Sequence, residues 1–199
     1  MRLRKSVLRE CARLALEQRG FRVGAVGGPG VVPGSRLRAS TQHESYEIAV
    51  RSSTDREIGL TRRPDGRWAT IPRMDEVIVV APAAEDPELA EVLSFAPEII
   101  VEAFDRALEV RQEEKPDLSL KGPIFLPLDI PIRRQGQEIF PALKTKAQWR
   151  KFVPFAEVPR PRLSPGATAA GFIERVKQEF ADLHGVDVSK VAVEFRITS

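Results

Sequence analysis

Six arginines between residues 36 and 63 are the side chains of this sequence best suited to chemistry: Arg36, Arg38, Arg51, Arg56, Arg62 and Arg63. A guanidinium presents its N–H donors in a planar fork, which matches the oxygens of a phosphate group. Arginines gathered in a concave site therefore attract nucleic acid without needing a metal ion. The same residues also fit a solvated face, with Arg51 paired to Asp55 or Glu47 as a structural ion pair. The sequence leaves both interpretations open.

The octapeptide YEIAVRSS, residues 46–53, must position Arg51. Its apolar and polar side chains alternate, which is typical of a half-buried strand. One face carries Tyr46, Ile48 and Val50, and the other carries Glu47, Ala49 and Arg51. A neighbouring strand is predicted at 35–40, joined to this one by the polar turn TQHE. The two strands together hold three of the six arginines.

Further elements surround this pair of strands. Helices are predicted at 2–19, where apolar residues recur at helical spacing before Gly20, and from Pro97 to about Glu113. Strands are predicted at 21–23, 74–82 and 90–95, and residues 54–67 are polar, with a PDG turn predicted at 64–66. These elements indicate an α/β fold with a mixed central sheet flanked by helices.

Composition sets broad limits on function. The chain has 199 residues, a net charge of +3 and an ordinary share of hydrophobic residues, 42%, so it is long enough for one domain with a core and an added segment. The mild positive charge permits an anionic partner without requiring one. Cys11 is the only cysteine and is expected to be a buried structural thiol, and the two histidines fit no zinc spacing. We expect a cytoplasmic protein without a signal peptide, a transmembrane helix or a membrane partner.

The second half of the chain has a different character. Nine of the sixteen prolines lie between residues 116 and 165. We therefore expect a core at 1–114, a Pro-rich extended arm or linker at 115–168, and a C-terminal helix–strand element at 169–199. Basic and aromatic residues alternate from Lys144 to Phe152, a pattern that can stack on single-stranded nucleic acid. The pattern equally fits an amphipathic helix docking through Trp149 and Phe152, and we favour that interpretation.

The order of these elements resembles a known superfamily. A helix, GFRV, a glycine-rich turn, two strands ending in IAVRSS and the buried strand DEVIVVAP follow the pattern of the PD-(D/E)xK restriction-endonuclease-like proteins. The sequence is similar to bacterial proteins with an I-x-V-(K/R)-(T/S) strand, then DR-x-(I/L)-G and W-x-T-(I/L)-x-x-(V/M)-D, which here read IAVRSS, TDREIGL and WATIPRMD. The resemblance spans roughly residues 3–113, and more loosely 171–197, and implies a restriction-endonuclease-like core.

The resemblance also implies a metal-dependent chemistry that this sequence lacks in its usual form. Such nucleases hold Mg²⁺ with an acidic residue on the earlier strand and a second carboxylate two residues before a lysine. Here Ser35 and Arg36 stand near the first position, Ala49 occupies the second, and Arg51 replaces the lysine. Arginine stays protonated and cannot act as a base.

Other carboxylates have the chemistry to replace the missing ones. Candidates for an active enzyme are Glu44, Glu47 and Glu10, acting with Arg51. Glu47 and Arg51, four residues apart on a strand, would be separated by about 13 Å, too far to hold one ion together. We therefore expect no catalytic residues, no metal site and no cofactor, with Mg²⁺ required only if the nuclease is active.

The sequence thus predicts a non-catalytic pseudo-nuclease that binds DNA or RNA, or a protein partner, through a vestigial cleft. It would belong to a complex, of the mobile-element or phage-defence kind by analogy with its fold. A protein partner, or a second copy of the chain, would bind through residues 121–155. The alternatives are an active Mg²⁺-dependent nuclease with migrated carboxylates, and a purely structural scaffold or assembly subunit.

Overall fold

The computed structural model describes residues 4–27, 31–69, 71, 73–115, 122–159 and 177. The chain divides into two compact units. The first comprises residues 1–26 and 32–158, and the second comprises 27–31 and 159–199. Of the helix–strand element predicted at 169–199, only Lys177 is described, in helical conformation. All that follows concerns the first unit, which is a mixed α/β structure.

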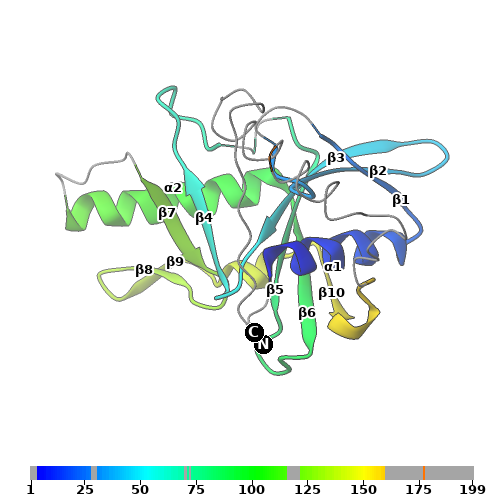
Figure 1. Cartoon of the computed structure of the whole chain (residues 1–199). Coiled ribbons are helices and arrows are strands. Elements are labelled where there is room, and N and C mark those ends of the chain that lie inside the picture. The colour runs from blue at the N-terminus through cyan, green and yellow to red at the C-terminus, as the bar shows by residue number, and fades with distance from the viewer. Residues whose placement is uncertain are drawn as a thin grey trace. The chain divides into compact units, whose positions relative to one another are not determined.

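A six-stranded mixed sheet forms the centre of this unit (Figure 1). Its order is β1 (Arg22–Ala25), β2 (Arg36–Ser40), β3 (Ser45–Ser52), β5 (Glu76–Pro82), β6 (Leu89–Phe95) and β10 (Trp149–Pro154). Neighbouring strands are antiparallel except β3 and β5, which run parallel. A parallel pair requires a crossover, and here residues 53–75 provide it.

Helix α1 (Lys5–Glu17) packs on one face of the sheet, against β1, β3, β5, β6 and β10. Its buried residues, Leu8, Cys11, Ala12, Ala15 and Leu16, follow the three- and four-residue spacing of one helix face. They meet Ile48 and Val50 of β3 and Ile78 and Val80 of β5 in a continuous core. Gly20, with φ of 88°, takes the left-handed conformation that turns the chain into β1.

Helix α2 (Pro97–Glu114) belongs to the core on the opposite face. Proline in its first turn suits a helix start, because the missing N–H would have no partner there. Its buried side chains pack with Val77 and Val79 of β5 and with a second, two-stranded sheet. That sheet pairs β4 (Glu57–Thr61) with β7 (Pro123–Pro127), and Figure 1 shows it beside α2.

The remaining elements are short. Strands β8 (Ile132–Arg134) and β9 (Gln137–Phe140) form a hairpin whose turn places Gln135 and Gly136 at positive φ. Two 3₁₀ helices follow, η1 (Leu143–Lys146) and η2 (Phe155–Glu157). Within the described residues, neither helix is long and apolar enough to cross a membrane.

The structure confirms most of the predicted elements of the first half. The helix predicted at 2–19 is α1, the strands at 35–40 and 45–51 are β2 and β3, and the apolar run at 74–82 contains β5. The polar stretch 54–67, for which no strand was predicted, contains β4. Ile58 and Leu60 alternate there with polar or small neighbours and are buried against α2 and β7.

The segment predicted as an amphipathic helix around Trp149 is a strand. β10 pairs with β6 and forms an edge of the central sheet. Trp149 is half-buried there, while Phe152 is exposed. Much of the stretch predicted as an arm at 115–168 likewise lies in the first unit, as strands β7 to β10. Prolines 123 and 127 stand at the two ends of β7, in a sheet of only two strands, where every strand is an edge.

Candidate functional site

Four arginines share one face of the antiparallel strands β1, β2 and β3. The strand register places Arg22 opposite Ser40, Arg36 opposite Ala49 and Arg38 opposite Glu47. Arg51 follows two residues after Ala49 and so lies on the same side. We call Arg22, Arg36, Arg38 and Arg51 the arginine face. The opposite side of these strands is covered by α1, whereas α2 packs chiefly against β5, β7, β8 and β9.

Glu47 is the single carboxylate among the strand residues of this face. Its Oε1 accepts a hydrogen bond from Arg38 Nε at 2.8 Å. Its backbone N–H donates to Asp75 Oδ2 at 2.7 Å, which fixes the start of β3 beside β5. Glu47 therefore serves as an ion-pair partner of Arg38.

Arg36 and Arg51 are close enough to affect one another. The pKa of Arg51 is lowered, first by burial of its side chain and then by the positive charge of Arg36. Arg51 remains protonated at neutral pH despite this lowering, because arginine starts from so high a pKa. Arg51 Nη2 also donates to the carbonyl oxygen of Ala69 at 3.3 Å. Two cations held side by side repel each other, and an anion bound between them would offset that repulsion.

Arg51 also lines a cleft of about 320 Å³ at the end of β3. We call it the β3 cleft. Basic side chains come from α1 and β3, hydroxyl groups from the segments around β3, and carboxylates from the start of β4. Its polar lining comprises Lys5, Arg9, Ser35, Arg51, Ser52, Ser53, Thr54, Asp55 and Glu57, and its other lining residues include Val32, Gly59 and Phe125.

Hydrogen bonds fix the polar wall of the β3 cleft. Arg9 Nη1 donates to the carbonyl oxygen of Pro33 at 2.5 Å, and Arg9 Nε donates to Ser52 Oγ at 3.4 Å. On the other side, Ser53 Oγ donates to Asp55 Oδ1 at 2.8 Å and accepts from the N–H of Glu57, also at 2.8 Å. The bond from Ser53 is the main cause that lowers the pKa of Asp55, and the charge of Lys5 adds to it. Hydrogen bonds thus fix Arg9 and Asp55 at this cleft, and Lys5 is close enough for its charge to act on Asp55.

The carboxylates predicted for an active nuclease lie apart from the β3 cleft and have other partners. Glu10 forms an ion pair with Arg13 on α1, Glu44 accepts a hydrogen bond from the hydroxyl of Tyr46, and Glu47 pairs with Arg38. None of the three lines the cleft. In the described part of the chain, no three His, Cys, Asp or Glu side chains gather as ligands for one metal ion.

The structure separates the other three predicted arginines from Arg36, Arg38 and Arg51. Arg62 donates to the carbonyl oxygen of Gly66 and lines a different groove, of about 720 Å³, beside α2. Trp68 forms part of that groove and is buried, with its Nε1 donating to Asp105 Oδ1 at 2.9 Å. Arg63 is exposed in the turn between β4 and Trp68. Arg62 therefore borders the groove beside α2, and neither Arg62 nor Arg63 lines the β3 cleft.

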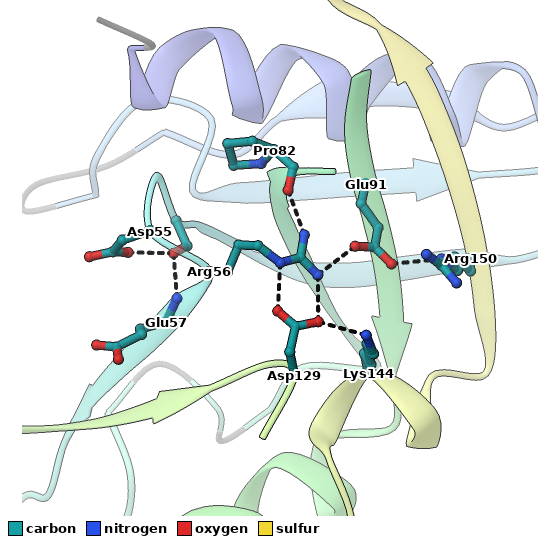
Figure 2. A network of polar contacts seen from close by, with 9 residues as sticks. Asp55, Arg56, Glu57, Pro82, Glu91, Asp129, Lys144 and Arg150 are labelled. Atoms are coloured by element: carbon teal, nitrogen blue, oxygen red, sulfur yellow. Dashed lines mark hydrogen bonds and ion pairs between the residues drawn. The ribbon is translucent and has the colours of Figure 1, made fainter. Parts of the chain in front are cut away.

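Arg56 lies in a network of charges at the edge of the core (Figure 2). Its guanidinium donates to Glu91 Oε2 at 2.7 Å and to both oxygens of Asp129, at 2.6 and 2.9 Å. Lys144 Nζ also pairs with Asp129 at 2.9 Å. Arg150 Nε lies 2.6 Å from Glu91 Oε1, an ion pair that falls short of hydrogen-bond geometry. Through these contacts Arg56 connects the start of β4 with β6 and the loop after β7. Its role is therefore structural, and it is not part of the arginine face.

Sequence reasoning missed Lys5, Arg9, Arg22 and Phe125. Lys5 and Arg9 are four residues apart on α1, a spacing that places two side chains on one helix face. The sequence predicts that spacing, but it does not predict that the two side chains lie at the end of β3. Phe125 is 66 residues beyond its strand partner Gly59, a separation that no local pattern reveals.

Comparison with known proteins adds little to this description. The sequence matches no family model and no curated protein. Among solved structures, the chain is similar to a bacterial homing endonuclease, I-Ssp6803I, with 12% identity and a TM-score of 0.38 over 72% of this chain and 83% of that one. It is also similar to MepB, with 14% identity and a TM-score of 0.25 over 50% of this chain and 69% of that one. Scores this low support no functional assignment, so the function must be argued from the side chains.

Proposed function

We propose that this protein binds nucleic acid through the arginine face and the adjoining β3 cleft, without cutting it. The observation that carries the proposal is the pair Arg36 and Arg51, held side by side on neighbouring strands and joined through Arg51 to a cleft with two further cations, Lys5 and Arg9. Phosphate groups along a nucleic-acid strand match such a row of fixed positive charges. Arg22 and Arg38 extend the row across β1 and β2.

The absence of cleavage in this proposal rests on the position of Ala49. In the resemblance to the PD-(D/E)xK superfamily, Ala49 stands where a metal-binding carboxylate is expected. Its side chain is fully buried in the core on the α2 side and offers no ligand. Ser35 and Arg36 stand near the position of the other acid. The narrower role of a subunit in a mobile-element or phage-defence complex rests on this resemblance alone.

A second candidate function is the binding of a protein partner through the Pro-rich half. Three large apolar side chains of that half are well exposed: Phe125 at 48%, Ile130 at 61% and Phe152 at 43%. Exposed apolar groups that lie together mark interaction surfaces, whereas single ones are common on any protein. Phe125 lies on β7 and Phe152 on β10, in two different sheets, so we rank this function second.

A mobility-shift assay on the whole chain tests the first proposal. DNA and RNA would be titrated at low and moderate salt with Mg²⁺ present, and the same gels would be read for cleavage. We expect a shift that weakens steeply with salt, and no cleavage. Arg36→Ala and Arg51→Ala should each weaken binding and lower the salt slope by about 1. Arg133→Ala removes an exposed arginine of the β8–β9 hairpin. It should change neither the affinity for nucleic acid nor the salt slope.

Two results would overturn the proposal. If neither nucleic acid shifts at low salt, the arginine face is a solvated surface and the partner-binding function takes its place. If Mg²⁺-dependent cleavage occurs and Glu44→Gln or Glu47→Gln abolishes it, the protein is an active nuclease with migrated carboxylates.

A further inference from the structure

Phe125 is an aromatic side chain facing outward at the β3 cleft. Its neighbours on β7, Ile124 and Leu126, point into the core and are buried, as strand alternation requires. Phe125 points the other way, is 48% exposed and lines the cleft. About half of this aromatic side chain is therefore open at a cleft whose other lining is mostly polar.

The ring of Phe125 packs against Gly59. The two residues are direct partners across β4 and β7. A Cβ atom on Gly59 would stand 2.9 Å from Cε1 of the ring and 3.1 Å from Cδ1, closer than side chains allow. Gly59 is not in the left-handed conformation, so its backbone does not require glycine. Glycine is needed there because only the absence of a side chain lets the ring come this close. The ring is thereby held against the strand while about half of the side chain stays open to the cleft.

Cations stand on the other walls of the same cleft. Lys5 and Arg9 come from α1, and Arg51 comes from β3. Arg9 is fixed by its hydrogen bonds to Pro33 and Ser52. The carboxylates Asp55 and Glu57 lie at the start of β4, and Gly59, against which the Phe125 ring packs, is also on β4. The cleft therefore combines three cations, an aromatic ring and two carboxylates.

We propose that the β3 cleft holds an unpaired nucleotide, whose base stacks on Phe125 and whose phosphate contacts Lys5, Arg9 and Arg51. This inference rests on the proposed function and names the form of nucleic acid that the protein prefers. Every base has a flat face that can stack on an aromatic ring, and stacking combined with a cationic groove is how proteins bind single strands. Bases inside a duplex are already stacked and cannot reach the ring.

The arrangement of charges supports the orientation of this nucleotide. A phosphate beside Asp55 and Glu57 would be repelled, which favours its placement toward α1 and β3. The N–H groups of a base, including the ring N–H of thymine, are hydrogen-bond donors and suit the carboxylates next to the ring. A cleft of about 320 Å³ lies at the lower end of the range for small-molecule sites and fits one nucleotide rather than a longer segment.

Fluorescence anisotropy with two labelled probes tests the inference. One probe is a single strand of about 20 thymidines and the other is a blunt duplex of similar length and mixed sequence. The wild-type chain should bind the single strand more tightly. Phe125→Leu, which keeps an apolar group over Gly59 but removes the ring, should weaken single-strand binding about tenfold and leave duplex binding unchanged. Phe125→Trp, which keeps an aromatic ring, should retain single-strand binding.

Phe152→Leu is the matched control, because Phe152 is exposed to a similar extent, 43%, but lies on β10. It should bind both probes like the wild type. Urea unfolding of each variant would verify that the fold is intact. The inference is overturned if Phe125→Leu binds the single strand normally while Arg36→Ala still weakens binding, a result that leaves the proposed function standing. Failure of the wild type to bind either probe at low salt, together with no RNA shift in the mobility assay, overturns both the inference and the proposed function.

A third result would point to a protein partner at this cleft. If sedimentation velocity shows a wild-type dimer that Phe125→Leu dissociates, and single-strand binding is unchanged in that variant, then Phe125 is a contact between two copies of the chain. Stacking on a base would then be rejected.

Discussion

Arg56 Nη2 donates a hydrogen bond to Glu91 Oε2 at 2.7 Å, and this contact joins a carboxylate that is 1% exposed to an arginine with left-handed backbone. Glu91 lies in the middle of β6, and the φ of Arg56 is 62°. An arginine in that conformation costs about 1 kcal/mol or more, which the surrounding contacts must offset. Figure 2 shows the guanidinium between Glu91, Asp129 and the carbonyl of Pro82.

Removal of the Arg56 side chain should destabilise the fold strongly. Arg56→Met leaves the buried Glu91 with Arg150 alone, and breaking a buried ion pair in this way costs about 3 to 5 kcal/mol. Urea unfolding should show a lower midpoint with an unchanged slope. Arg106→Ala breaks an exposed pair with Glu109 on α2 and should cost about 0.5 kcal/mol or less. Equal effects of the two variants would show that the network contributes no more than a surface pair.

The stability contributed by Asp129 should depend on pH. Its hydrogen bond from Arg56, with the nearby Lys144, lowers the pKa of Asp129 from 3.8 to about 2. Because the pKa is lower in the folded state, the contribution is complete above about 3.8 and is lost as the pH falls toward about 2. The difference in unfolding free energy between wild type and Asp129→Asn should therefore shrink by an amount on the order of 2 kcal/mol across that range. A difference that stays constant would contradict the lowered pKa.

The local part of this fold was predictable from the sequence because its signals are local. The helical spacing of Leu8, Cys11 and Ala15 predicts α1, and the alternation around Ile48 predicts β3. The apolar run within residues 74–82 predicts a strand buried on both faces, and β5 contributes to both cores. These patterns depend only on residues within one element.

What sequence reasoning missed depends on pairing over long distances. β10 looks like part of an amphipathic helix, because Trp149 and Phe152 are three residues apart, yet its register with β6 makes it a strand. Likewise the prolines of β7 suggest an arm, but pairing with β4 places Ile124 and Leu126 in the core. The β3 cleft combines α1, β3, β4 and β7, so its residues lie as far apart as Lys5 and Phe125. No spacing rule brings these together.

Gly59→Ala should reveal the contact between Gly59 and Phe125. The new Cβ would collide with the ring, and because the ring is half-exposed it can yield, so we expect a loss of about 1 kcal/mol. The Phe125→Ala background should remove that loss, which a double-mutant cycle by urea unfolding would measure. Gly24→Ala is the matched control, since a Cβ on that β1 glycine meets open space. If Gly59→Ala lowers the free energy of unfolding equally with and without the ring, the ring does not pack against Gly59.

Cys11 should resist thiol reagents as long as the chain is folded. The thiol is fully buried against the sheet, and burial, with the charge of Glu10, raises its pKa to about 12. Only the thiolate reacts, and the buried sulfur is also out of reach of reagents. Iodoacetamide followed by mass spectrometry should therefore find little modification in native buffer at neutral pH and complete modification in denaturant. Ser45→Cys, which places a second thiol at an exposed position of β3, should be modified once without denaturant. Rapid labelling of Cys11 in the native wild type would mean that α1 opens readily from the sheet.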